Sequence, residues 1–172
     1  MSQRLGSIVW LTGLPSSGKS TLATRVADAL RVRGHEAIVV LDGDAVRAAI
    51  VPPHGYDDAS RDAFYETLAR LAALLSSQGL DVLVPATARK RAHRERARQL
   101  APAAFVEVFV DTDPERCRER DAKGLYAKAA GGEGAATLPG LGADYERPET
   151  PDEIVREDDR DAIARLLARL RA

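Results

Sequence analysis

Residues 13–20 read Gly-Leu-Pro-Ser-Ser-Gly-Lys-Ser and match the phosphate-binding pattern G-x-x-x-x-G-K-[ST] at each fixed position. The two glycines let the backbone curl, so that successive N–H groups point at phosphate oxygens. Lys19 can reach the β- and γ-phosphates of a nucleotide, and the hydroxyl of Ser20 can ligate Mg²⁺. A helix that begins here adds the partial positive charge of its N-terminus. The stretch predicts a nucleotide site with phosphate contacts from Gly13, Ser16, Ser17, Gly18, Lys19, Ser20 and Thr21.

The residues on either side of this loop indicate the strand and the helix that it requires. Residues 7–12 form an apolar run typical of a buried strand, and residues 21–30 carry Leu22, Val26 and Leu30 at helical spacing. The alternative is a Gly- and Ser-rich turn that binds no nucleotide. The order strand, loop, helix argues against that alternative.

The composition is ordinary for a globular protein of 172 residues, with 45% hydrophobic and 30% charged residues and a net charge of −1. This length fits one domain, residues 1–172. The near-neutral charge and the aromatic content of 5% argue against nucleic acid as a partner. The only cysteine, Cys117, excludes an intramolecular disulfide and a Cys-rich zinc site. No apolar run approaches the ~20 residues of a transmembrane helix and no signal peptide is evident, so we expect a cytoplasmic protein without a membrane partner.

Strands and helices are predicted in alternation along the chain. After the first helix we expect strands at residues 36–41, 80–84 and 104–110, and helices at 45–50, 61–77, 91–100 and 114–120. This alternation implies an α/β fold with a parallel sheet of the P-loop NTPase type and helices on both faces. A last helix is predicted at residues 161–172, where apolar surface would suit a homodimer. Its apolar face is formed by Ile163, Leu166, Leu167 and Leu170.

Residues 121–148 differ from the rest, because they contain many Gly and Ala residues and show little periodicity. A structureless segment of this length inside a domain is unusual unless it has a function. In a kinase with a phosphate-binding loop, that function is a lid that closes over the substrates and excludes water. A disordered insertion is the alternative. Lys123 is placed to reach phosphate when such a lid closes.

Two aspartates, Asp42 and Asp44, follow the second predicted strand. The carboxyl ends of parallel strands form the edge where open α/β sheets bind ligands. Phosphoryl transfer needs a carboxylate near the attacking hydroxyl, and Asp42 fits that role. Either aspartate could instead cap the next helix.

Cationic side chains follow the second and third predicted strands. Arg47 and Arg61 lie on the expected acceptor side. A basic run after the third strand is interpreted mainly as a solvated helix face, with one or two members near an anionic acceptor. It consists of Arg89, Lys90, Arg91, Arg94, Arg96 and Arg98. The histidines His35, His54 and His93 show no ligand spacing, so we interpret them as surface residues and expect no metal beyond Mg²⁺.

Several motifs together resemble the adenylylsulfate kinase (APS kinase) family. Beside the phosphate loop these are Leu41-Asp42-Gly43-Asp44 with Arg47, then Lys123-Gly124-Leu125-Tyr126, then Tyr145-Glu146-x-Pro148. The resemblance implies transfer of the γ-phosphate of ATP to the 3′-hydroxyl of adenosine 5′-phosphosulfate (APS), with Mg²⁺. It implies Lys19, Asp42 and Lys123 as catalytic residues, with Asp42 as base or as organiser of Mg²⁺ together with Ser20. The residues implied to bind the acceptor are Asp44, Arg47, Tyr56, Arg61, Phe64, Lys123 and Leu138.

The chain departs from that family pattern mainly on the acceptor side. Ala45 and Phe64 each stand where the family has Asn, and Ala88-Arg89 stands where it has Ser-Pro. Family arginines correspond to Glu66 and Thr67, and another to Ala130. Leu138-Pro139-Gly140 replaces a Phe-Thr-Gly that covers the acceptor's adenine. These changes favour, as an alternative, a related kinase that phosphorylates a sugar, a nucleoside or a secondary metabolite. A nucleotide-binding module without turnover is a third hypothesis, which the presence of Lys19, Ser20, Asp42 and Lys123 argues against.

Overall fold

Five parallel strands form one sheet in the part of the chain that the computed structural model describes, namely residues 5–102, 105–121, 124–131, 138–139 and 144–170. The strand order is β2-β3-β1-β4-β5, and every neighbouring pair is parallel. The strands are β1 (Ile8–Thr12), β2 (Ile38–Val40), β3 (Asp81–Pro85), β4 (Phe105–Asp111) and β5 (Glu153–Arg156). The predicted α/β fold is confirmed.

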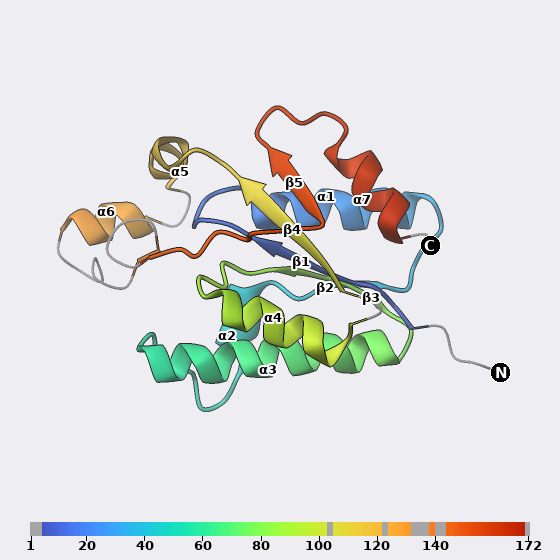
Figure 1. Ribbon diagram of the computed structural model, residues 1–172, viewed down its shortest axis with the longest axis horizontal. Coiled ribbons are helices and arrows are strands. Elements are labelled where there is room, and N and C mark those ends of the chain that lie inside the picture. Colours follow the sequence, from blue (N-terminus) through green and yellow to red (C-terminus); the bar gives the residue numbers. More distant parts are fainter. Residues whose placement is uncertain (1–4, 103–104, 122–123, 132–137, 140–143, 171–172) are drawn as a thin grey trace.

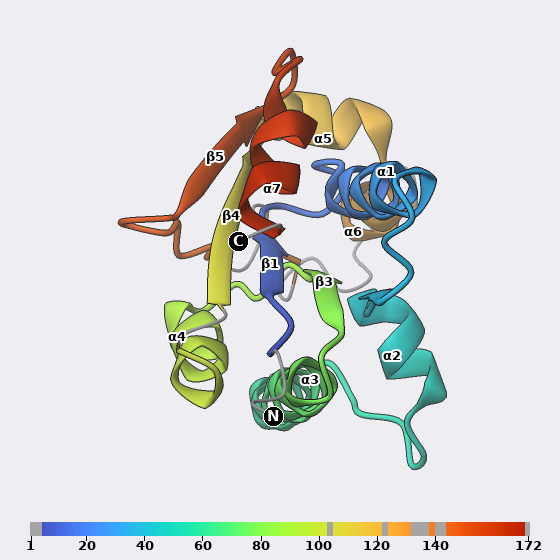
Figure 2. The same cartoon turned by 90° about the vertical axis from the view of Figure 1, so that its right-hand side faces the viewer.

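Helices cover both faces of this sheet (Figures 1 and 2). One face carries α1 (Lys19–Val32) and α7 (Ala162–Leu170), and the other carries α3 (Asp58–Ser77) and α4 (Arg91–Leu100). The short helix α2 (Gly43–Ala49) follows β2. Helices α5 (Pro114–Arg120) and α6 (Leu125–Ala130) lie on the side toward which the strand arrows point.

The central strand β1 shows why the sheet is buried on both sides. Val9 and Leu11 belong to the apolar cluster that α1 and α7 complete. Ile8 and Trp10 point the other way, into the cluster that includes residues of α3 and α4. Since successive side chains of a strand alternate between faces, an apolar run without polar interruptions is what a strand between two helical layers requires.

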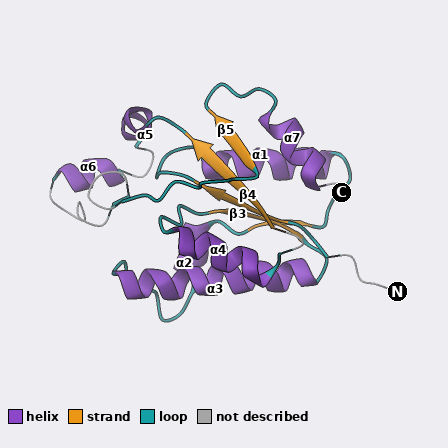
Figure 3. Ribbon diagram, viewed as in Figure 1, coloured by secondary structure: helices purple, strands orange, loops and turns teal. Residues whose placement is uncertain are grey.

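The order of the strands places the ends of several loops together. β1 lies between β3 and β4. The chain runs from β1 to β2 toward one edge of the sheet, and from β3 to β4 toward the other edge. Open α/β sheets bind ligands in the crevice that forms at such a point, outside the carboxyl ends of the strands. Figure 3 shows the loops that follow β1, β3 and β4 on this side of the molecule.

Two predicted helices begin earlier than expected, because aspartate side chains cap them. The side chain of Asp42 accepts the N–H groups of Asp44 and Ala45, so α2 starts at Gly43. Asp57 accepts the Ser60 N–H at 2.9 Å, so α3 starts at Asp58 instead of residue 61. The capping interpretation of Asp42 is therefore confirmed as a structural role.

Two elements were not predicted. β5 is a four-residue edge strand in which only Val155 is buried, so its apolar pattern is too short to recognise. α6 lies inside residues 121–148, and the expectation that this segment lacks regular structure is wrong for Leu125–Ala130. Lys123 lies outside the described residues, as do residues 132–137 and 140–143.

The terminal helix α7 packs its apolar face into the protein. Leu166, Leu167 and Leu170 are each no more than 2% exposed and belong to the cluster with α1. The apolar surface that favoured a homodimer is therefore used within the chain, and the homodimer stays a prediction without this support. Over the described residues, the helices lack the combination of length and apolar character needed to span a membrane.

Candidate functional site

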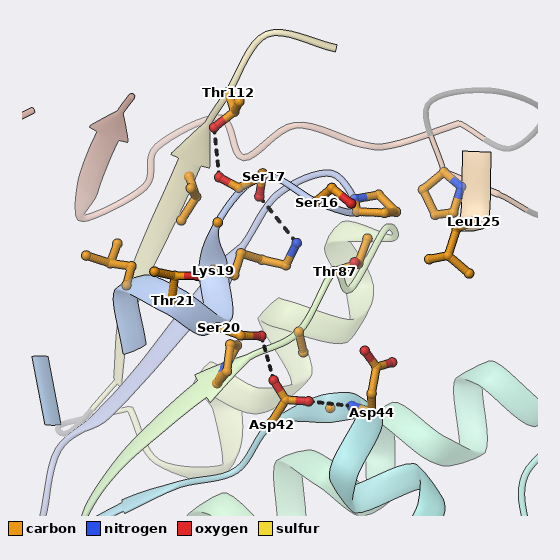
Figure 4. A pocket seen from close by; sticks show the side chains of 18 of the residues that line it. Ser16, Ser17, Lys19, Ser20, Thr21, Asp42, Asp44, Thr87, Thr112 and Leu125 are labelled. Carbon is orange, nitrogen blue, oxygen red and sulfur yellow. Dashed lines mark hydrogen bonds between the residues drawn. The ribbon is translucent and has the colours of Figure 1, made fainter. Parts of the chain in front are cut away.

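A cavity of about 1010 Å³ lies at the carboxyl ends of the strands. Its walls come from the phosphate loop, the starts of α2 and α3, the ends of β3, β4 and β5, and α6 (Figure 4). Thirteen predicted site residues line it: Ser16, Ser17, Gly18, Lys19, Ser20, Thr21, Asp42, Asp44, Arg47, Tyr56, Arg61, Phe64 and Leu138. The cavity thus brings together residues that are as far apart in the chain as the phosphate loop and the predicted lid.

The phosphate loop needs glycine where it approaches β4 and where it enters α1. Gly13 has φ +151°, and a Cβ there would lie 2.5 Å from the carbonyl oxygen of Val110. Gly18, directly before α1, has φ +99° in the left-handed region. The hydroxyl of Thr112 donates to the carbonyl of Ser17 at 2.9 Å and so anchors the loop to the end of β4.

Lys19 holds its ammonium group within the curl of this loop. Its side chain is only 8% exposed, and Nζ donates to the carbonyls of Gly13 at 3.0 Å and Leu14 at 2.6 Å. The hydroxyl of Ser17 lies 3.3 Å from the same Nζ. A buried, hydrogen-bonded cation beside the N-terminus of α1 gives the loop a concentrated positive potential, which suits phosphate.

The two carboxylate oxygens of Asp42 face different partners (Figure 4). Oδ1 accepts the N–H of Asp44 at 3.0 Å and caps α2, whereas Oδ2 accepts the hydroxyl of Ser20 at 2.6 Å. The second contact joins the end of β2 to the first turn of α1, across 22 residues of sequence. The carboxylate therefore faces the phosphate loop as well as its own helix, and the two readings of Asp42 do not exclude each other. Asp44 is exposed in the first turn of α2.

A cluster of cationic and aromatic side chains from α2, α3 and the loop between them forms another part of the cavity wall, here called the acceptor wall. Arg47 lies over the ring of Phe64, with 3.8 Å from its guanidinium carbon to the ring centroid, and over Tyr56 at 4.8 Å. Arg61 donates from Nε to the carbonyl of Tyr56 at 2.6 Å, and burial lowers the pKa of its guanidinium below the ordinary value. Sequence reasoning missed Tyr65, which lines the same cavity and accepts the Ala88 N–H at 2.9 Å. The spacing i, i+4 from Arg61 was the available signal, because it puts both residues on one helix face.

The predicted lid segment meets the phosphate loop through α6. Leu125, Lys128, Leu138 and Pro139 line the cavity, and the hydroxyl of Tyr126 donates to the carbonyl of Pro15 at 3.1 Å. The side chain of Asp121 accepts the N–H groups of Tyr126 and Ala127 and fixes the start of this helix. Residues 125–131 are therefore attached to the phosphate loop.

The residues after this segment are attached to the centre of the sheet through Tyr145. Its hydroxyl lies 2.8 Å from that of Thr12, which also donates to the carbonyl of Thr87 at 2.6 Å. The ring stacks against Phe109 with 6.2 Å between the centroids, and burial raises the pKa of Tyr145 to about 12. The segment that returns from the predicted lid thus has a fixed position beside β1 and β4.

Arg94 corrects the interpretation of the basic run as mainly a solvated face. It is 2% exposed, pairs with Glu107 at 2.7 Å and donates to the carbonyls of Ala88 at 2.5 Å and Glu146 at 2.7 Å. The other five residues of the run also form ion pairs: Arg89 with Asp58, Lys90 with Asp62, Arg91 with Glu149, Arg96 with Glu66, and Arg98 with Asp152. Arg94 therefore links α4 to β4 and to the segment around Tyr145.

Replacing Arg94 with Met is expected to destabilise the protein by about 3 kcal/mol, because Glu107, only 13% exposed, loses its closer cationic partner and two carbonyls lose a donor. Arg96→Met is the matched control on the same helix. Its pair with Glu66 is far more exposed than that of Arg94, and Glu66 keeps a second partner in Arg70, so the loss should stay below about 1 kcal/mol. Urea unfolding of both variants measures the difference. Equal losses would show that Arg94 is not a buried anchor.

The histidines do not all lie on the surface as expected. His93 is 7% exposed, its Nε2 lies 2.8 Å from Asp62 Oδ1, and its ring stacks on Tyr65 with 4.4 Å between centroids. Burial lowers the pKa of His93, so its neutral form is favoured. His35 is partly buried and lies 2.8 Å from the buried carboxylate of Asp81. The surface interpretation is wrong for His93 and inaccurate for His35.

Comparison with known proteins shows likeness along nearly the whole chain. The sequence profile of a family described as adenylylsulphate kinase matches residues 5–156. The adenylyl-sulfate kinase of Paraburkholderia xenovorans (strain LB400) is 38% identical, over 99% of this chain and 96% of that protein. The bifunctional enzyme NodQ of Azospirillum brasilense is 41% identical over 95% of this chain, which spans only 27% of that enzyme. Among solved structures, the Mycobacterium tuberculosis APS kinase CysC in complex with AMPPNP and APS superposes with a TM-score of 0.90 and 38% identity, covering 98% of this chain and 99% of that one.

Proposed function

The chain belongs to the adenylylsulphate kinase family, and on this basis we propose that it transfers the γ-phosphate of ATP to the 3′-hydroxyl of APS. The products are ADP and 3′-phosphoadenosine 5′-phosphosulfate, the activated form of sulfate. The observation that carries the proposal is one cavity with two different parts. The phosphate loop with Lys19 lines one part, and Arg47 and Arg61, which come from α2 and α3, line another.

The donor part of the cavity suits the phosphates of ATP. Lys19 brings a buried positive charge into the loop, and the N-terminus of α1 adds its partial charge. We assign the contacts with the β- and γ-phosphates to Lys19 and to the loop N–H groups between Gly13 and Thr21. Lys123, outside the described residues, is proposed to join them from the lid segment.

Two residues that line the cavity fit Mg²⁺. The Ser20 hydroxyl and the Asp42 carboxylate lie 2.6 Å apart, and both present the oxygen atoms that Mg²⁺ prefers. Among the described residues no group of three or more His, Cys, Asp or Glu side chains could hold a metal by itself. This agrees with the way Mg²⁺ binds in kinases, through one or two protein oxygens together with phosphates and water. When bound, Mg²⁺ neutralises charge that develops on the phosphate oxygens.

Asp42 is also the side chain best placed to receive the proton of the attacking hydroxyl. It follows β2, contacts Ser20 of the phosphate loop and lines the same cavity as Arg47 and Arg61. In the transfer, the 3′-oxygen forms a bond to the γ-phosphorus, the bond from that phosphorus to the β-phosphate oxygen breaks, and the hydroxyl proton passes to the carboxylate. Positioning and charge do most of the catalytic work in such reactions, so the geometry of the cavity matters more than the acid strength of any one group.

ADP release with Mg·ATP, measured with and without APS, tests this proposal. We expect release that depends on APS and equals the amount of 3′-phosphorylated product found by mass spectrometry. A panel of sugars and nucleosides in place of APS examines the alternative acceptor class, which the aromatic Phe64 in the acceptor wall favours. APS-independent ADP release, or faster turnover of another hydroxyl compound, would contradict the proposal.

A further inference from the structure

Arg47 is held in one orientation by contacts that leave half of its guanidinium unused. Its Nη1 donates to the carbonyls of His54 at 3.3 Å and Gly55 at 2.9 Å. Within the described residues, no hydrogen bond engages Nε or Nη2, and no carboxylate forms an ion pair with this side chain. The basic run Arg89–Arg98 is different, since each of its cations has an acidic partner. Arg47 lines the cavity, and the Nε and Nη2 edge of its guanidinium keeps three N–H groups that no described residue accepts.

Phe64 is the rigid surface against which Arg47 rests. It is 2% exposed, lies in the 20-residue helix α3, and has the guanidinium carbon 3.8 Å above its ring centroid. Its ring also meets the ring of His54 edge to face, with 6.2 Å between centroids. His54 belongs to the loop whose carbonyls receive Nη1. One aromatic ring therefore supports both the cation and the loop that orients it.

We propose that Phe64 is a positioning residue for the acceptor: it fixes the guanidinium of Arg47 so that the free Nε and Nη2 edge binds the phosphosulfate anion of APS. This inference rests on the proposed function, because it names the anion of that substrate. A planar guanidinium recognises oxyanions through two parallel N–H···O bonds, which require a fixed plane. A cation over an aromatic face keeps such a plane without losing donors to a competing carboxylate.

A double-mutant cycle on Phe64 and Arg47 tests the proposal. The variants are Phe64→Leu, Arg47→Met and the pair together, with initial rates measured over APS concentration at saturating Mg·ATP. Phe64→Leu is expected to raise the KM for APS about tenfold and to change the KM for ATP little, since a desolvated cation–π contact has about that strength. In the Arg47→Met background, Phe64→Leu should add almost nothing. Phe64→Tyr keeps the aromatic face and should restore the KM for APS.

Phe105→Leu is the matched control, because Phe105 also lies under an arginine. The guanidinium carbon of Arg98 is 4.8 Å from its ring centroid, and Phe105 is buried and is not among the residues that line the cavity. This variant should lower the melting temperature as Phe64→Leu does and leave the KM for APS at the parent value. If Phe105→Leu also raised the KM for APS, general destabilisation would explain the result for Phe64→Leu, and the proposal would be overturned.

The outcomes distinguish a wrong positioning role for Phe64 from a wrong proposed function. If the parent enzyme turns over APS and Phe64→Leu raises the KM equally in both Arg47 backgrounds, the positioning role is wrong while the function stands. If the parent neither binds APS in calorimetry nor turns it over, the proposed function is wrong and the inference falls with it. A KM that rises only while Arg47 is present supports both.

Discussion

Asp42→Asn is expected to lower kcat about a thousandfold while the stability of the fold stays close to that of the parent. The two carboxylate oxygens have separate tasks: Oδ1 caps α2 through Asp44 N–H, and Oδ2 receives the Ser20 hydroxyl. An asparagine keeps an oxygen for the cap, and Asn and Asp are similarly good N-cap residues. It removes the negative charge that we propose to accept the proton and to attract Mg²⁺. Single-turnover rates and urea unfolding on the same samples measure both effects.

Asp42→Ala and Asp113→Ala complete this test. Asp42→Ala should lower kcat as Asp42→Asn does. It should also lose about 1 kcal/mol of stability, because the N-cap of α2 is removed. Asp113 caps α5 by accepting the Glu115 N–H at 2.8 Å and does not line the cavity, so Asp113→Ala should lose stability alone. Parent-like turnover in Asp42→Asn would remove the carboxylate from the mechanism and leave Asp42 as a helix cap only.

Lys19→Met is expected to lower kcat about a thousandfold and to weaken ATP binding about ten- to a hundredfold. The ammonium group is buried within the phosphate loop, so its charge acts where solvent screens it little. Methionine has similar length and removes the charge together with the hydrogen bonds to Gly13 and Leu14. Calorimetry with a non-hydrolysable ATP analogue gives the affinity, and ADP release with APS gives kcat.

Lys90→Met serves as the control for a changed net charge. Lys90 pairs with Asp62 at 2.8 Å and is not among the residues that line the cavity, so its loss should leave ATP affinity unchanged. If Lys19→Met and Lys90→Met weakened ATP binding alike, the effect would reflect the overall field of the protein, and the assigned contact between Lys19 and phosphate would be wrong.

Local sequence was sufficient for the parts of the fold that depend on neighbouring residues. The phosphate loop, the apolar run of β1 and the periodic spacing in α1 lie within some thirty residues, and each signal reflects contacts between residues one turn or one strand apart. The edge strand β5 was not predicted, because a strand of four residues with one buried side chain is too short to show an alternation of apolar and polar residues. The helix α6 was not predicted, because the Ala- and Gly-rich composition of the surrounding segment is more typical of a loop than of a helix.

The site residues also fall into those that local sequence reveals and those that depend on distant partners. Lys19, Ser20 and Asp42 were recognisable from motifs, since their chemistry requires particular residue types at particular spacings. Tyr65, buried Arg94 and the contact of Thr12 with Tyr145 were not, because each depends on partners far away in the chain. Thr12 and Tyr145, for example, are 133 residues apart in the chain and are in contact only in the folded protein.

By itself, therefore, the sequence determined the fold class, the phosphate loop and the family, because these reside in short-range patterns of polarity and in motif spacing. Only the tertiary structure decided that Asp42 contacts both its own helix and Ser20, that Arg94 is an internal anchor, and that Phe64 supports Arg47. The physical reason is that burial removes water as a competing partner, so the role of a charged or aromatic side chain is set by the groups that packing brings beside it.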